Sequence, residues 1–115
     1  MGVSIEQCQG IPLVKIDEDF DITNAGEVKE ILNEYIETKQ SKKIIIDLSR
    51  VDFIDSTAIG VIVKSSLLML NKYKGKLTLI NVQEALQDFF AKSNLDKFIK
   101  ICDNLEQAIE YLSNN

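Results

Sequence analysis

The sequence predicts a single α/β domain in which about four helices pack on a mixed, largely parallel sheet of roughly four or five strands. Short apolar segments of strand length alternate with longer segments whose apolar residues recur at helical spacing, in the order β-β-α-β-α-β-α-β-α. The 115 residues are 45% hydrophobic and 27% charged, which is typical of a globular chain. Because the chain shows neither an internal repeat nor a linker, we expect one domain over residues 1–115, with its core over about residues 3–112.

The N-terminal third is expected to form two strands and a helix. Residues 3–9 and 11–16 have the composition of strands, and Gly10 between them favours a tight turn. Asn24 precedes a segment of helical periodicity and has Glu27 three residues after it, as in a helix cap. The apolar positions of this helix are Ala25, Val28, Ile31, Leu32, Tyr35 and Ile36.

The middle of the chain is expected to contain two strands and a long helix. Residues 44–48 are a short strand-like segment that is apolar except at Asp47, which is typical of a central strand buried on both faces. A helix is expected over residues 59–73 with Gly75 as its stop signal, and residues 76–81 are expected to form the next strand. The positions of this helix expected to face the core are Ile59, Ile62, Val63, Ser66, Leu67 and Leu70.

The C-terminal third is expected to contain a helix over residues 84–92, a brief strand over residues 98–101 and a last helix. Asp103, with Glu106 three residues after it, is expected to open the last helix. The neighbours Phe89 and Phe90 cannot both face one core, so one of them is expected at the surface.

The composition excludes several classes of function. The net charge is −5 with scattered lysines, which argues against a nucleic-acid partner. No apolar run approaches the roughly 18 residues that span a bilayer, and no secretion signal is present, so we expect a cytoplasmic protein without membrane insertion. The chain has no histidine and no glycine-rich phosphate loop, and its two cysteines, Cys8 and Cys102, lack metal-ligand spacing and are expected as free thiols. We therefore expect no catalytic, cofactor-binding or metal-binding residues, and hence no enzyme.

The most informative segment is the junction at Asp55-Ser56-Thr57, where an apolar strand region gives way to a helical pattern. The first backbone N–H groups of a helix lack internal partners, and the helix dipole favours negative charge there. A hydroxyl at this place either caps the helix or accepts a phosphoryl group. The residues alone leave both roles open.

Two segments carry a resemblance to a known family. Ile44-Ile45-Ile46-Asp47-Leu48-Ser49 followed by Ile54-Asp55-Ser56-Thr57-Ala58-Ile59-Gly60 resembles the STAS family, and more narrowly its stand-alone bacterial anti-sigma factor antagonists. A second match covers residues 93–101 and the segment Leu105-Glu106-Gln107-Ala108. Element order and length also fit, so the resemblance extends over nearly the whole chain.

The resemblance implies a regulatory switch in which the protein is a substrate and not a catalyst. The unmodified form would bind an anti-sigma factor that is also a serine kinase, phosphorylation of Ser56 would break the complex, and a serine phosphatase would restore it. Thr57 is the alternative acceptor. The partner-binding residues implied are Asp21, Asp55, Ser56, Thr57, Ile59, Gly60 and Lys64.

The chain departs from the family pattern at two places, and two other functions stay open. The segment before Asp21 lacks the usual glycine, and Ala58 replaces a commoner glycine, which makes the backbone beside Ser56 less permissive. One alternative is a constitutive scaffold subunit of a stress-signalling or membrane-transport complex. The other is weak nucleotide binding or hydrolysis, for which the chain supplies no phosphate loop.

Overall fold

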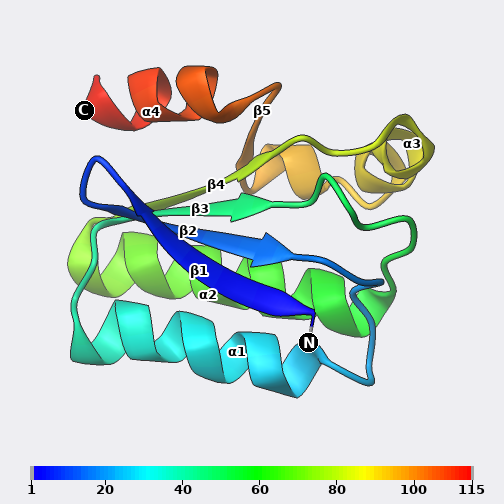
Figure 1. Cartoon of the computed structure of the whole chain (residues 1–115), viewed down its shortest axis with the longest axis horizontal. Helices are drawn as coiled ribbons and strands as arrows, with labels where there is room; N and C mark the ends of the chain where they lie inside the picture. Colours follow the sequence, from blue (N-terminus) through cyan, green and yellow to red (C-terminus); the bar gives the residue numbers. More distant parts are fainter. Residues whose placement is uncertain (1, 115) are drawn as a thin grey trace.

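The computed structural model describes residues 2–114 as a five-stranded sheet with the strand order β1-β2-β3-β4-β5 (Figure 1). The strands are β1 (Val3–Cys8), β2 (Ile11–Ile16), β3 (Lys43–Asp47), β4 (Lys76–Ile80) and β5 (Lys100–Cys102). The helices are α1 (Ala25–Asn33), which continues into a π-helical turn over Glu34–Thr38, α2 (Ser56–Tyr73), α3 (Glu84–Lys92) and α4 (Leu105–Ser113). β1 is antiparallel to β2 and the other pairs are parallel. The expected α/β fold with its mixed, largely parallel sheet is confirmed.

The sheet is covered on both faces, which explains the unbroken apolar run in its central strand. Helices α1 and α2 lie under one face and α4 lies over the other (Figure 1). Ile44 and Ile46 belong to the larger core cluster with α1 and α2, whereas Ile45 belongs to the smaller cluster with α4. Successive side chains of a strand point to opposite faces, so the three central positions of β3, Ile44 to Ile46, are all apolar and buried.

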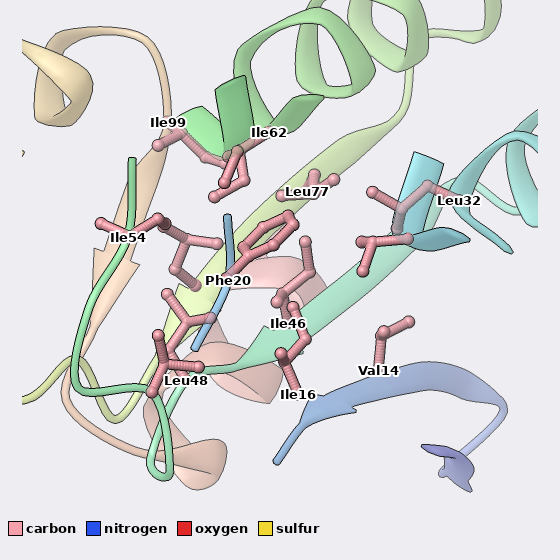
Figure 2. Packing of buried hydrophobic residues seen from close by; sticks show 14 of the residues in the cluster. Val14, Ile16, Phe20, Leu32, Ile46, Leu48, Ile54, Ile62, Leu77 and Ile99 are labelled. Carbon is pink, nitrogen blue, oxygen red and sulfur yellow. The ribbon is translucent and has the colours of Figure 1, made fainter. Parts of the chain in front are cut away.

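The larger core cluster reaches the loops at the carboxyl ends of β2 and β3. Phe20, which follows β2, is fully buried in this cluster together with Ile46 and Ile54 (Figure 2). This end of the core supports the loops that precede α1 and α2.

The face that α2 turns to the core agrees with the expected one at Ile62 and Ser66 and differs from it elsewhere. Leu67 and Leu70 are 39% and 52% exposed, so their expected burial is wrong. The buried positions are Ala58, Ile62, Ser65, Ser66 and Met69. Small residues at three of these positions let the helix lie close to the sheet. Of these, Ser66 was expected to be buried, whereas Ala58 and Ser65 were not.

Two expected helix caps also differ. The side chain of Asn24 does not cap α1; its Oδ1 accepts a hydrogen bond from the backbone N–H of Asp21 at 3.0 Å. In the last helix the cap is Asn104 rather than Asp103, since the Asn104 Oδ1 accepts from the Gln107 N–H at 2.9 Å. Both asparagines use their amide oxygen locally, but the pattern did not predict which backbone group would donate.

Gly75 follows α2 as expected, but its role differs from that of a left-handed cap. The left-handed residue is Lys74, with φ 58°. A Cβ on Gly75 would lie 2.9 Å from the backbone oxygen of Lys42. Glycine is therefore needed here for the close approach of two chain segments.

The remaining expectations for the C-terminal part hold with small shifts. Phe90 is buried and Phe89 is exposed, as expected for adjacent aromatic residues. The last strand begins at Lys100 rather than at residue 98, and Phe98 is exposed before it. Both cysteines are free, with Cys102 buried and Cys8 half-buried.

Candidate functional site

The carboxylate of Asp55 joins the start of α2 to the loop that follows β2. Asp55 is the N-cap residue of α2, and its Oδ1 accepts a hydrogen bond from the Ala58 N–H at 2.9 Å. Its other oxygen, Oδ2, accepts from the Ile22 N–H, also at 2.9 Å. One side chain thus caps the helix and fixes the neighbouring loop.

Backbone contacts support the same junction. Phe20 and Ile54 form an isolated parallel bridge. The Phe20 N–H donates to the Phe53 oxygen at 3.0 Å, and the Asp55 N–H donates to the Phe20 oxygen at 3.3 Å. The loop that carries Asp21 therefore lies against the segment that leads into Ser56.

Ser56 is the first residue of α2, and its side chain is exposed, as is that of Thr57. Neither hydroxyl hydrogen-bonds to another residue within 2–114, since Asp55 already supplies the cap. The interpretation of Ser56 as an ordinary capping hydroxyl is therefore wrong. Its hydroxyl is available for modification at the positive end of the helix dipole.

Asp21 shapes the turn that leads into α1. Its Oδ1 accepts hydrogen bonds from the backbone N–H of Thr23, at 2.9 Å, and from the Thr23 hydroxyl. Both hydrogen bonds lower the pKa of the Asp21 carboxyl, and the bond from the Thr23 hydroxyl has the larger effect. Asp21 is therefore ionised at neutral pH. Its backbone oxygen also accepts from the Asn24 and Ala25 N–H groups at 3.1 and 2.8 Å.

A groove of about 660 Å³ runs between α1 and α2 beside this junction. The two helices lie side by side and start at the same end, next to the carboxyl ends of β2 and β3 (Figure 1). The groove is lined by Ala25, Gly26, Lys29, Asn33, Ser56, Thr57, Gly60, Val61, Lys64, Ser65 and Leu68. Four of the site residues expected from the sequence are in this lining, namely Ser56, Thr57, Gly60 and Lys64. Asp21, Asp55 and Ile59 are not, and Ile59 packs half-buried against the core.

The family assignment follows from comparison with known proteins. A model of the STAS domain matches residues 3–108. The chain belongs to the STAS domain family. Its sequence is 31% identical over 94 residues to a Thermotoga maritima protein assigned as an anti-sigma factor antagonist, which covers 82% of each chain. It is 24% identical over 112 residues to the anti-sigma F factor antagonist of Paenibacillus polymyxa, with 97% of this chain and 95% of the relative covered.

A solved structure agrees with these relatives. The crystal structure of a Thermotoga maritima protein assigned as an anti-sigma factor antagonist superposes with a TM-score of 0.89 at 25% identity, covering 96% of this STAS domain and 94% of the other chain. The resemblance inferred from the motifs is thus confirmed. Anti-sigma factor antagonists of the STAS family are regulators and not enzymes, which confirms that expectation as well.

Three further residues, two at the junction and one in the groove, were not predicted from the sequence. Ile22 and Phe53 are 71% and 53% exposed, and each lies in one of the two loops that Asp55 and Phe20 hold together. The sequence pattern that could have indicated Ile22 and Phe53 is an apolar residue next to an aspartate in a loop. Lys29 lines the groove from α1, which no pattern within that helix reveals.

No cluster of three or more potential metal ligands exists within residues 2–114 of this STAS domain. Nor does that part of the chain contain a helix long and apolar enough to cross a membrane.

Replacing Asp55 by Ala is expected to lower the free energy of unfolding by about 1–2 kcal/mol, since it removes a helix cap and the acceptor for the Ile22 N–H. Urea unfolding followed by circular dichroism measures this change. Asp55→Asn should lose less, because its amide oxygen can still accept from Ala58. Asp52→Ala, at an exposed neighbouring position, is the control and should change stability by less than about 0.5 kcal/mol. Equal stabilities of Asp55→Ala and Asp52→Ala would contradict the structural role of Asp55.

Proposed function

We propose that this STAS domain is a cytoplasmic anti-sigma factor antagonist whose unmodified form binds an anti-sigma factor, and that phosphorylation of Ser56 switches this binding off. The observation that carries the proposal is the exposed Ser56 hydroxyl at the first residue of α2, left without a structural task because Asp55 caps the helix. In the proposal the anti-sigma factor is also the serine kinase, and a serine phosphatase reverses the modification.

The proposed partner surface combines the start of α2 with the loop that precedes α1. Ser56, Thr57, Gly60 and Lys64 contribute from the helix, and Asp21 contributes an ionised carboxylate from the loop. In the proposal Asp55 positions the other residues and does not itself contact the partner, because its two hydrogen bonds hold the start of α2 and the loop together.

Exposed apolar side chains on the two joined loops support a protein as the partner. Ile22 and Phe53 each expose more than half of their surface beside the junction. Apolar side chains of this kind, ringed by polar groups, are typical of the centre of a protein–protein interface. The acids Asp21 and Asp52 supply polar groups next to them.

The charge of a phosphate makes the switch physically reasonable. Phosphorylation adds about −1.5 to −2 charges at neutral pH. In the free protein this charge lies in water at the positive end of α2, which stabilises it by about 0.3–1 kcal/mol. The fold of the free protein therefore tolerates the modification. In a complex the same charge would lose its hydrating water, so the phosphate destabilises the complex.

The test is a transfer reaction with the isolated partner. The partner is purified from the native cell on this protein as bait and is then incubated with the protein and ATP. We expect a mass increase of about 80 Da on Ser56, seen by fragmentation, together with loss of the complex. Ser56→Ala is the matched control and should bind without being modified.

Two other results would overturn the proposal in different ways. Transfer to Thr57 would move the acceptor by one residue. A stable complex that shows no transfer under turnover conditions would instead favour a constitutive scaffold.

A further inference from the structure

Two glycines in the groove between α1 and α2 have no structural explanation. Gly26 and Gly60 are helical, and neither has a positive φ. A Cβ added at either position would meet no atom within 4 Å. Glycine is less favourable than alanine inside a helix, so neither backbone geometry nor packing accounts for them. Both line the groove, and their shared effect is to keep it open.

The charge of the groove is opposite to that of the protein. The chain carries a net charge of −5, yet the groove lining contains Lys29 and Lys64 and no acidic residue. Neither lysine pairs with a carboxylate within residues 2–114. The N-termini of α1 and α2 lie at the same end of the groove and add partial positive charge (Figure 1). The groove therefore attracts negative charge.

The shape and the apolar lining identify the class of occupant. Ala25, Val61 and Leu68 supply apolar surface next to the two lysines. The groove follows α2 from Ser56 to Leu68, and the rise between these two residues corresponds to about 18 Å of helix. A single small anion would leave most of this length and all of the apolar surface uncovered. A peptide segment with both acidic and apolar side chains fits these properties.

We infer that the groove between α1 and α2 receives an acidic, partly apolar segment of the partner protein, and that a phosphate on Ser56 competes with this segment for the groove's positive charge. The inference rests on the proposed function, because it names the chemistry by which the same surface recognises its partner. Ser56 lines the groove and is the first residue of α2, and α1 begins at the same end as α2 (Figure 1), so Ser56 lies at the end where both helices are positive. A phosphate there neutralises the attraction and also repels an acidic segment.

The glycines provide a test in which stability and binding change in opposite directions. Gly60→Ala and Gly26→Ala should each raise the melting temperature by about 2–5 °C, because alanine favours the helix and meets no obstacle. The same variants should weaken partner binding, and Gly60→Leu should weaken it at least about tenfold by filling the groove. Ala85→Leu, on the exposed surface of α3, is the control and should bind as the original protein does. Unchanged binding by Gly60→Leu would overturn the inference.

The lysines provide a second test, measured by calorimetry with the purified partner. Lys29→Glu and Lys64→Glu should each weaken binding by roughly tenfold to a hundredfold, and binding of the original protein should weaken as salt is raised. Lys92→Glu, at the end of α3 outside the groove, is the control for the change in net charge. Replacing an acidic residue of the partner segment by lysine should restore binding to the Lys64→Glu variant.

The outcomes separate this inference from the proposed function. If both lysine variants bind normally while Ser56→Asp does not, the groove inference is overturned and the phospho-switch stands. If Ser56→Asp also binds normally, the proposed function fails as well. Self-association of the protein alone that Lys64→Glu abolishes would assign the groove to a second copy and overturn the inference.

Discussion

Replacement of Phe20 by alanine is expected to lower the free energy of unfolding by about 3–5 kcal/mol, among the largest effects of a single substitution in this protein. Phe20 has no exposed surface and is among the largest fully buried side chains. Its ring lies in the cluster that joins the sheet to α1 and α2 (Figure 2). Alanine would leave a cavity that the surrounding β-branched side chains cannot fill, because they have few rotamers. Urea unfolding measures the loss.

The same substitution should also loosen the candidate site, because the backbone of Phe20 bonds to both Phe53 and Asp55. We expect faster hydrogen exchange at the Asp55 and Ile22 N–H groups in Phe20→Ala than in the original protein. Phe20→Leu keeps most of the volume and should lose markedly less stability. Phe98→Ala removes the same ring from a position that is 56% exposed and serves as the control. A loss in Phe20→Ala no greater than that in Phe98→Ala would contradict the central role of Phe20.

The fold could be predicted because its signals are local and repeated. The apolar run at Ile44–Ile46 indicates a strand buried on both faces, and its neighbours along the chain show helical periodicity. Connections between parallel strands of one sheet are helical and right-handed, so the element order limits the possible topologies to a few. The structure has this arrangement, with only β1 antiparallel.

The rotation of α2 about its own axis could be predicted only in part, at Ile62 and Ser66. Apolar residues occur around most of this helix, so periodicity alone does not select the buried face. The side of α2 that carries Ala58, Ser65 and Ser66 packs against the sheet, because small side chains permit close packing. Leu67 and Leu70 are left exposed as a consequence.

The sequence indicated Ser56 as the phosphoacceptor candidate, but it did not show that Asp55 is the residue that caps the helix. The motif placed Asp55 and Ser56 together without showing which of them caps the helix. That depends on a bond between Asp55 and Ile22, 33 residues away in the sequence. Lys29 could not be predicted either, because it lines the same groove as Lys64 only when α1 and α2 pack side by side. Contacts between elements define the site, and local patterns do not contain them.

Substitution of Ser56 by aspartate is expected to weaken partner binding by about tenfold to a hundredfold without loss of stability. A single negative charge about 6 Å from an acidic group of the partner, at an effective dielectric constant of about 20–40, costs roughly 1.4–2.8 kcal/mol. In the free protein the aspartate occupies the first turn of α2, where the dipole stabilises it by about 0.3–1 kcal/mol. Calorimetry with the partner and thermal unfolding of the free protein measure the two effects separately.

The contrast with alanine distinguishes charge from the loss of the hydroxyl. Ser56→Ala should bind its partner with an affinity within about threefold of the original, because the hydroxyl makes no hydrogen bond within residues 2–114 and Asp55 retains the cap. Ser4→Asp, on the exposed strand β1, adds the same charge away from the site and should bind normally. Equal affinities of Ser56→Ala and Ser56→Asp would show that negative charge at this position does not control the complex. Because Asp55 and not Ser56 holds the helix start in place, any such difference in affinity arises at the interface and not from a change in the fold.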